Sequence, residues 1–339
     1  MQIKIKNNYL NFLLKSLIVL LVGWVIYTQV FARENAAALW QQFTAQLDAK
    51  NGEWLFFALL LMPLNWVLEA MKWRNLVLTF EIISRWRAVQ ATMSGVTMGI
   101  FTPNRIGEYG GRILFIKSEN QWKAVIATLV GGFSQFLIII SVGVLGCSYY
   151  FVRYFNLEPY ILQILLFAGF FLTLGMLFFY FNIDLIIKVI KRIKRLINIP
   201  FLEKYVQIAL KQVKVLQNYT SGQLGLALVY AFLRYIVYTV QYYAMLRFFG
   251  IEVALLSALA GISTIFLVQS SLPLPPVTGL LVRGGMAIKI WGLFTNNELS
   301  ILATTFGLWL INVILPALIG LIFISNINIL KSIGYEKDK

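Results

Sequence analysis

The sequence predicts an all-α polytopic integral membrane protein, with about six full transmembrane helices and two re-entrant helical hairpins that enter from opposite sides. Of the 339 residues, 59% are hydrophobic and only 13% are charged, a composition outside the range of soluble globular domains. Long apolar runs alternate with short polar connections. Two stretches inside this apolar chain contain prolines and glycines, which interrupt a continuous helix. We expect residues 1–339 to form a single transmembrane domain.

The apolar runs predict where the chain crosses the bilayer. The predicted spans are residues 10–31, 54–69, 125–150, 161–181, 224–249 and 301–324. The first run is about 22 residues long, which is too long for the apolar part of a signal peptide and favours a span. Lysines precede it and lysines follow the last span, so the positive-inside rule predicts that both termini are cytoplasmic.

The composition excludes several classes of function. The chain contains no histidine and a single cysteine, Cys147, so an intrachain disulfide, a thiolate cluster and a histidine-based metal or acid–base site are not expected. We expect no cofactor. The net charge is +15, but most basic residues fall in segments assigned to the inside, and acidic residues outnumber basic ones outside. The charge therefore indicates topology and not a nucleic-acid partner.

The first break lies in residues 98–117, which read MGIFTPNRIGEYGGRILFIK. A proline, three glycines that follow it and charges of both signs occur here at predicted membrane depth, where such residues normally face protein or water. A re-entrant hairpin with arms 88–101 and 106–116 fits this pattern. The alternative is a cytoplasmic loop between two full spans, but the apolar run before the proline has only about 14 residues. The candidate binding residues are Thr102, Pro103, Arg105, Gly107, Glu108 and Arg112.

The run from Thr102 to Glu108 resembles the T-P-x-R-x-G-E signature of the lysylphosphatidylglycerol synthase transmembrane family, the flippase-like membrane domain. The resemblance extends over nearly the whole chain in hydropathy. It implies a multi-pass protein of a bacterial-type cytoplasmic (inner) membrane. Full-length members carry a soluble aminoacyl-transferase domain after the membrane part. We expect this chain to lack that domain because it ends at Lys339.

The span 224–249 carries Arg234 near its middle. An arginine there costs roughly 2.5–3.5 kcal/mol on insertion scales and normally faces a protein interior or cavity. Snorkelling to the surface is the alternative, but it would have to cover roughly 15 Å of helix. Tyrosines and Gln241 extend this polar lining. We expect Glu108 to pair with Arg234, Arg105 or Arg112.

The second break is residues 272–279, with predicted arms 253–271 and 280–294. Either a hairpin entering from outside or two spans satisfies the topology, and the prolines favour the hairpin. Aligning Pro103 with Pro275 gives a weak internal repeat, as in transporters built from inverted repeats. The sequence departs from the family's second motif, which usually ends in glutamate, because Arg283 follows Val282 here. Arg283 is a further candidate binding residue.

Residues 182–222 form a basic cytoplasmic segment in which apolar residues recur at helical intervals between 183 and 199. An amphipathic helix on the inner leaflet is one interpretation. A positive-inside anchor without further function explains the same residues.

Three functions are compatible with these features. The first is a flippase- or scramblase-like translocator, or a binder, of an anionic or phosphate-containing lipid, because guanidinium groups suit phosphate. The second is a membrane-embedded lipid-modifying enzyme, which the missing histidines and metal ligands disfavour. The third is a non-transporting scaffold that docks a lipid-synthesis enzyme on segment 182–222. No GxxxxGK[ST] motif is present, so we expect no direct coupling to ATP, and we do not expect an enzyme.

Overall fold

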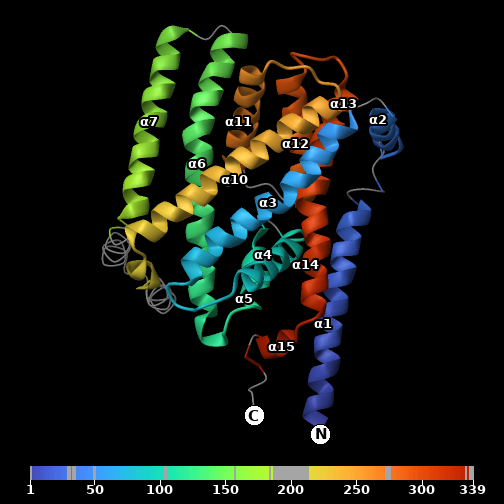
Figure 1. Ribbon diagram of the computed structural model, residues 1–339, viewed down its shortest axis with the longest axis vertical. Coiled ribbons are helices and arrows are strands. Elements are labelled where there is room, and N and C mark those ends of the chain that lie inside the picture. The colour runs from blue at the N-terminus through green and yellow to red at the C-terminus, as the bar shows by residue number, and fades with distance from the viewer. Residues whose placement is uncertain are drawn as a thin grey trace, which may run out of the picture.

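The computed structural model in Figure 1 describes residues 2–28, 32, 36–48, 51–102, 105–155, 158–182, 185, 214–271, 276–332 and 334–335. Within these residues, every regular element is a helix. The α-helices are α1 (Gln2–Ile26), α2 (Ala36–Asp48), α3 (Gly52–Val77), α4 (Arg85–Gly99), α5 (Gly107–Ile113), α6 (Gln121–Phe155), α7 (Pro159–Phe181), α10 (Ser221–Phe248), α11 (Leu255–Ser271), α12 (Pro276–Trp291), α13 (Glu298–Trp309), α14 (Leu315–Ser325) and α15 (Ile329–Ser332). A π-helical segment, Leu310–Ile314, joins α13 to α14.

Six of the described helical stretches are long and apolar enough to cross a bilayer, which confirms the predicted number of spans. They are Tyr9–Ile26, Gly52–Val77, Ser118–Phe155, Pro159–Phe181, Ser221–Phe248 and Glu298–Ser325. Each one coincides with a predicted span, although α3 and α6 extend well beyond the predicted ends. The chain is therefore a multi-pass membrane protein.

Local sequence signals fix where several helices begin. Thr220 and Gln223 form a capping box at the start of α10, because the Thr220 hydroxyl accepts from the Gln223 N–H while the Gln223 side chain accepts from the Thr220 N–H. Ser84 caps α4 and Asn297 caps α13 in the same way with one bond each. These caps satisfy backbone N–H groups that have no partner inside the helix.

Helices α3 and α10 run diagonally and in opposite directions across the front of the bundle in Figure 1, and they pack along each other. The hairpin α4–α5 lies in the lower half of that view, where α4 packs on α14. Helices α11 and α12 lie in the upper half, where α11 packs on α6. Both chain termini are at the lower end.

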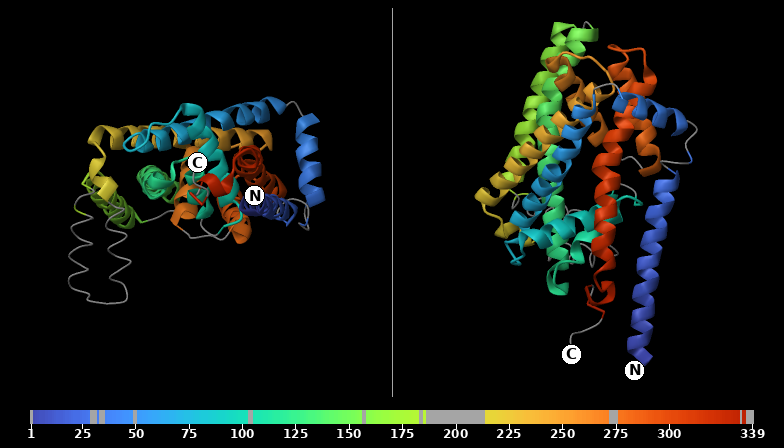
Figure 2. Two further views of the ribbon diagram at one scale, coloured as in Figure 1. Left: turned by 90° about the horizontal axis from the view of Figure 1, so that it is seen from below. Right: turned by 45° about the vertical axis from the view of Figure 1, so that its right-hand side comes forward.

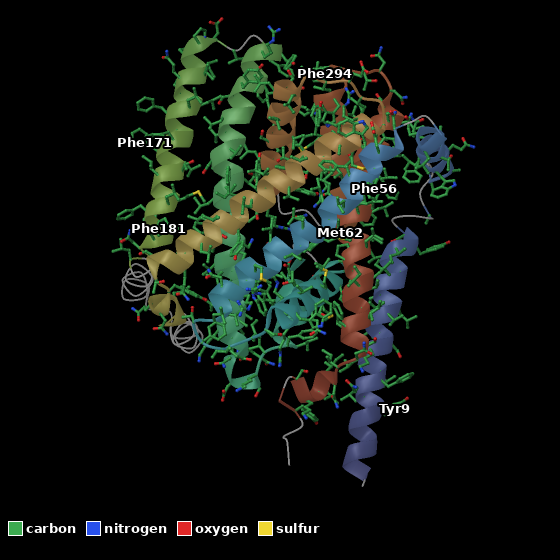
Figure 3. All side chains as sticks on the ribbon, viewed as in Figure 1. Tyr9, Phe56, Met62, Phe171, Phe181 and Phe294 are labelled. Carbon is green, nitrogen blue, oxygen red and sulfur yellow. The ribbon has the colours of Figure 1, made fainter. Side chains whose placement is uncertain are left out.

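Helices α1 and α7 form opposite sides of the bundle, as the view from below in Figure 2 shows. Exposed aromatic side chains such as Phe171 cover the outer surface of α7 (Figure 3). Apolar surface of this kind is suited to contact with lipid chains. The two outer helices therefore leave the polar interior to α3, α4, α5, α6 and α10–α14.

Helices α4 and α5 lie on either side of the first break, and glycines allow them to pack closely. A Cβ atom on Gly111 would lie 2.6 Å from the Cα of Gly95, and one on Gly107 would lie 2.9 Å from the Thr102 hydroxyl oxygen. A Cβ atom on Gly110, in contrast, would meet no atom within 4 Å. Gly107 and Gly111 are thus required by the close approach of the two helices, and Gly110 is not.

The second break separates α11 from α12, which have 17 and 16 residues. Its tip, residues 272–275, lies outside the described residues. Pro103 and Asn104 at the first tip lie outside them as well, and so do residues 183–184 and 186–213, which include most of the predicted amphipathic helix and basic segment. The described residues nearest that segment form a short 3-10 turn, Lys214–Asn218.

We predict that Gly111→Ala destabilises the protein by about 1–3 kcal/mol, because the added methyl group forces α4 and α5 apart. Gly110→Ala makes the same chemical change one residue earlier and should be neutral or stabilising by up to about 1 kcal/mol, since alanine favours a helix more than glycine does. Thermal unfolding of both variants in one detergent measures the difference. Equal melting temperatures would contradict the close approach.

Candidate functional site: a cavity lined by guanidinium groups

A buried carboxylate, Glu69 of α3, connects three helices at the centre of the bundle. Its side chain lies 2.7 Å from Nζ of Lys72, 2.9 Å from Nη2 of Arg112 and 3.2 Å from Nη1 of Arg234. Glu69 is only 7% exposed and Lys72 only 1%. Charges at this depth persist only when they are paired, because burial removes their hydration. Glu69 therefore allows cations from α3, α5 and α10 to occupy the apolar interior.

A second carboxylate, Glu108 of α5, extends this cluster. It pairs with Arg112 one helical turn away and lies 3.5 Å from Nε of Arg105. The expectation that Glu108 pairs with Arg105 or Arg112 is confirmed. The alternative partner Arg234 binds Glu69 instead, because α10 packs along α3. Two carboxylates thus face four cations, and the cluster has an excess of positive charge.

Aromatic rings support two of the guanidinium groups in this cluster. The guanidinium carbon of Arg112 lies 5.6 Å from the centre of the Trp73 ring, and that of Arg234 lies 5.2 Å from the centre of the Trp66 ring. Cation–π contacts of this kind are stronger when water is excluded. They hold the planes of both guanidinium groups while leaving their edges available for hydrogen bonds.

The turn between α4 and α5 positions Arg105. The hydroxyl of Thr102 accepts a hydrogen bond of 2.8 Å from the Gly107 N–H. Arg105 has φ +57°, and it is the only non-glycine residue in the described part of the chain with a positive φ. A left-handed conformation costs a side-chain-bearing residue roughly 1–2 kcal/mol. Such strain is concentrated at functional sites, so the turn is a candidate for binding.

A cavity of about 350 Å³ lies between the two halves of the bundle. Arginines from three different elements reach it: Arg105 from the α4–α5 turn, Arg234 from α10 and Arg283 from α12. None of the described residues that line it is acidic. Its wall also contains polar and aromatic side chains, namely Asn65, Trp66, Gln135, Tyr235, Tyr238, Phe266, Gln269, Ser270, Trp309 and Asn312.

Arg283 differs from the other two arginines in having no counter-ion among the described residues. It pairs with no carboxylate among the residues that the structure describes, and its buried Nε atom has no hydrogen-bond partner there. Arg234, in contrast, donates a hydrogen bond of 3.4 Å to Gln135 in addition to its ion pair with Glu69. A buried donor without a partner is costly, which makes Arg283 a candidate contact for an external anion.

Asn65 and Asn312 of the cavity wall belong to a buried chain of amide side chains. Asn65 donates a hydrogen bond of 2.9 Å to Asn312, and Asn312 donates one of 2.9 Å to Gln241. Gln241 in turn donates a hydrogen bond of 2.8 Å to the carbonyl of Ala58. Asn312 lies in the π-helical segment Leu310–Ile314, a form of helix that occurs frequently at functional sites. This chain fixes α10 and α13–α14 to α3, and Gln241 itself does not line the cavity.

A family model described as the lysylphosphatidylglycerol synthase TM region matches residues 12–320. The chain belongs to this family. No curated protein shows significant sequence similarity to it. The family assignment confirms the resemblance that was first seen in the Thr102–Glu108 run.

The structure brings some predicted site residues to the cavity and separates others from it. Of the predicted set, Arg105, Arg234 and Arg283 line the cavity. Arg112 is 2% exposed and, with Glu108, belongs to the ion-pair cluster behind the wall. Thr102 and Gly107 shape the turn, and Gln241 lies in the amide chain. Pro103 lies outside the described residues.

Sequence reasoning missed the central role of Glu69. Its position near Lys72 was compatible with a polar cluster at the inner end of the span, and the structure shows that pair together with two arginines. A carboxylate three residues before a lysine inside an apolar helix was the available signal. Asn65 and Asn312 carried only a weak signal, because isolated amides are common in spans.

The cavity suits an anion with several acceptor oxygens. Three guanidinium groups can present paired N–H donors to phosphate or carboxylate oxygens, in a bidentate geometry that lysine cannot match. The described residues contain no group of three or more acidic, histidine or cysteine side chains that could hold a metal ion. The geometry therefore points to anion recognition by side chains of the protein.

We predict that Glu69→Gln destabilises the protein by about 3–5 kcal/mol, because Lys72, Arg112 and Arg234 then lose the carboxylate that they share. Glu53→Gln is the matched control, since Glu53 is exposed in the first turn of the same helix. Thermal unfolding in detergent compares the two variants. Similar melting temperatures would show that the ion-pair cluster does not hold the bundle together.

Proposed function

We propose that the protein binds a lipid with an anionic or phosphate-containing headgroup and allows that headgroup to cross the membrane. The observation that carries this proposal is the cavity lined by Arg105, Arg234 and Arg283, with no acidic residue in its described wall. A cation would be repelled there, and a neutral headgroup would leave the guanidinium groups uncompensated. An anion satisfies both the charge and the hydrogen-bond donors.

The ion-pair cluster supports reversible binding. Arg234 and Arg105 are each shared with a carboxylate, Glu69 or Glu108, that lies outside the described cavity wall. A phosphate group competes with these carboxylates for the same guanidinium groups. At Arg283 it displaces no carboxylate of the described residues. The empty site is thereby partly compensated, and this limits how tightly it holds the headgroup. A translocator requires such a balance, because the lipid must also leave.

The size of the cavity supports a headgroup as the occupant. A volume of about 350 Å³ is at the lower end of the range for small-molecule sites. It is suited to a headgroup and not to a whole diacyl lipid. The acyl chains then stay in the surrounding bilayer while the polar group crosses the protein.

Two oppositely oriented re-entrant hairpins are part of the proposal. α4, α11 and α12 have 15, 17 and 16 residues, fewer than the ~20 that a straight span needs. The α4–α5 and α11–α12 pairs lie in opposite halves of the bundle in Figure 1. The first helix of each pair also packs on a helix that belongs to a long apolar span: α4 packs on α14, and α11 packs on α6. This arrangement supports an inverted repeat around a site near the midplane.

The proposal also covers the membrane in which the protein lies, the energy source of lipid movement and the chemical fate of the lipid. We place the protein in a bacterial-type cytoplasmic membrane with both termini inside, as the distribution of basic residues favours. Movement of the lipid is passive or driven by a gradient, and the lipid leaves chemically unchanged. The alternative function is a scaffold that docks a lipid-synthesis enzyme on segment 182–222.

We predict that Arg283→Gln lowers the rate of headgroup movement by about ten-fold or more, since a hydrogen bond to a charged group contributes about 1.5–3 kcal/mol. The assay uses vesicles that contain the purified protein and fluorescent phosphatidylglycerol or phosphatidylcholine, with a membrane-impermeant quencher. Arg283 has no carboxylate partner among the described residues, so this variant should fold normally.

Arg153→Gln is the control for that experiment, because Arg153 is exposed at the end of α6 and does not line the cavity. Its vesicles should behave like wild type. Mass spectra of the recovered lipids should show no added group, even with aminoacyl-tRNA present. Wild-type rates in folded Arg283→Gln would contradict the site, and a modified lipid would contradict the absence of enzymatic activity.

We also predict that the two hairpin tips are reached from opposite faces. In a Cys147→Ser background, Ile106→Cys and Ser271→Cys place single thiols beside the two tips, at positions where the side chains are exposed. Membrane-impermeant maleimide applied to right-side-out and inverted vesicles should label each variant from one face only, and the faces should differ. Labelling of both from the same face would contradict the inverted arrangement.

A further inference from the structure

A second hollow lies on the outer surface of the bundle, between α3, α4 and α10. This outer groove has a volume of about 690 Å³ and shares no lining residue with the central cavity. Apolar side chains line most of it, including Val67, Met71 and Leu226. Arg74, Asn75, Arg85, Trp86 and Tyr230 supply its polar and aromatic part.

The two arginines of the groove, Arg74 and Arg85, have no acidic partner among the described residues. Arg74 is near the end of α3, and its Nε atom donates a hydrogen bond of 2.9 Å to the carbonyl of Ile83. Arg85 is the first residue of α4, and its side chain is exposed. Neither pairs with a carboxylate of the described chain. Glu81, in the loop that joins the two helices, accepts instead from Asn120 and from the Lys117 N–H.

The apolar walls extend away from these arginines along the helices. Val67 precedes Arg74 by seven residues of α3, which corresponds to roughly 10 Å of helix. Val67 is 43% exposed and Leu226 is 42% exposed, although both lie in helices that are apolar enough to cross a bilayer. Those side chains therefore face lipid chains, while the arginines lie where the helices end.

Trp86 marks the level of the membrane surface in this groove. It is 61% exposed, and its ring makes an edge contact with Phe323 of α14 at 5.5 Å between ring centres. Tryptophan is enriched where a bilayer meets water, because one part of the ring is apolar and the N–H needs a polar partner. Arg74 and Arg85 are thus at the depth of the lipid phosphate groups.

We propose that this outer groove binds one anionic phospholipid from the cytoplasmic leaflet. Arg74 and Arg85 bind the phosphate group, and an acyl chain lies against Val67, Met71 and Leu226. The charge of the arginines selects an anionic headgroup, and the apolar walls select a lipid over a soluble phosphate or an acidic protein. The groove is separate from the central cavity, so the proposal holds whether or not the protein moves lipid.

Photo-crosslinking with mapped sites tests this binding in membranes. The purified protein is placed in bilayers with phosphatidylglycerol or phosphatidylcholine that carry the same photoreactive acyl chain, and crosslinked peptides are located by mass spectrometry. We expect peptides of the outer groove to prefer phosphatidylglycerol. Helix α7 is the internal reference, because its exposed surface is apolar and its sequence has no charged residue. Its crosslinks should show no preference.

Arg85→Gln should lower the preference at the groove by about five-fold, the effect of one arginine at an anionic surface. Arg153→Gln, which changes an exposed arginine outside the groove, should leave it unchanged. Arg74→Lys keeps the positive charge but loses the hydrogen bond to the Ile83 carbonyl. This variant should retain most of the preference for phosphatidylglycerol. Equal crosslinking of the two lipids at the wild-type groove, or an unchanged preference in folded Arg85→Gln, would overturn the proposal.

Discussion

The contact between Glu69 and its three cations is the interaction on which the arrangement of the interior depends. Lys72 lies on the same helix, but Arg112 comes from the α4–α5 hairpin and Arg234 from α10. In an apolar bundle there is little hydrophobic force to place one helix against another. Charges that cannot be left unpaired supply that specificity, since any other packing of α3, α5 and α10 would expose them to hydrocarbon.

Close backbone contact provides the second constraint. Gly107 and Gly111 let α5 lie directly against α4, and Gly320 lets α14 approach α4 in the same manner. Small residues serve this purpose in membrane proteins because dispersion contacts and backbone hydrogen bonds act over short distances. Arg105, which lies two residues before α5, adopts a left-handed conformation and lines the cavity.

Charge is thus distributed over two layers. The inner layer pairs Glu69 and Glu108 with lysine and arginine, and it is structural. The cavity layer takes one guanidinium group from each half of the bundle, Arg105 and Arg283, and one from the central helix, Arg234. Arg234 of α10 belongs to both layers, since it pairs with Glu69 and also lines the cavity. The family assignment fits a membrane domain of a lipid-related protein.

The sequence by itself determined the membrane class, the six spans, the two breaks and the family. These properties depend on short-range features: the length of apolar runs, proline and glycine in a helix, and the seven residues from Thr102 to Glu108. Arg105, Arg234 and Arg283 were also identifiable, because an arginine in an apolar segment is costly wherever it points.

Only the tertiary structure decided which of these polar residues meet. Arg234 pairs with Glu69 and not with Glu108, Gln241 turns to the amide chain, and Arg112 is buried behind the cavity. The rotation and tilt of each helix decide which face is turned inward, and both result from packing against helices that are distant in the sequence. A linear pattern of polar residues gives their depth in the membrane, but it does not give their partners.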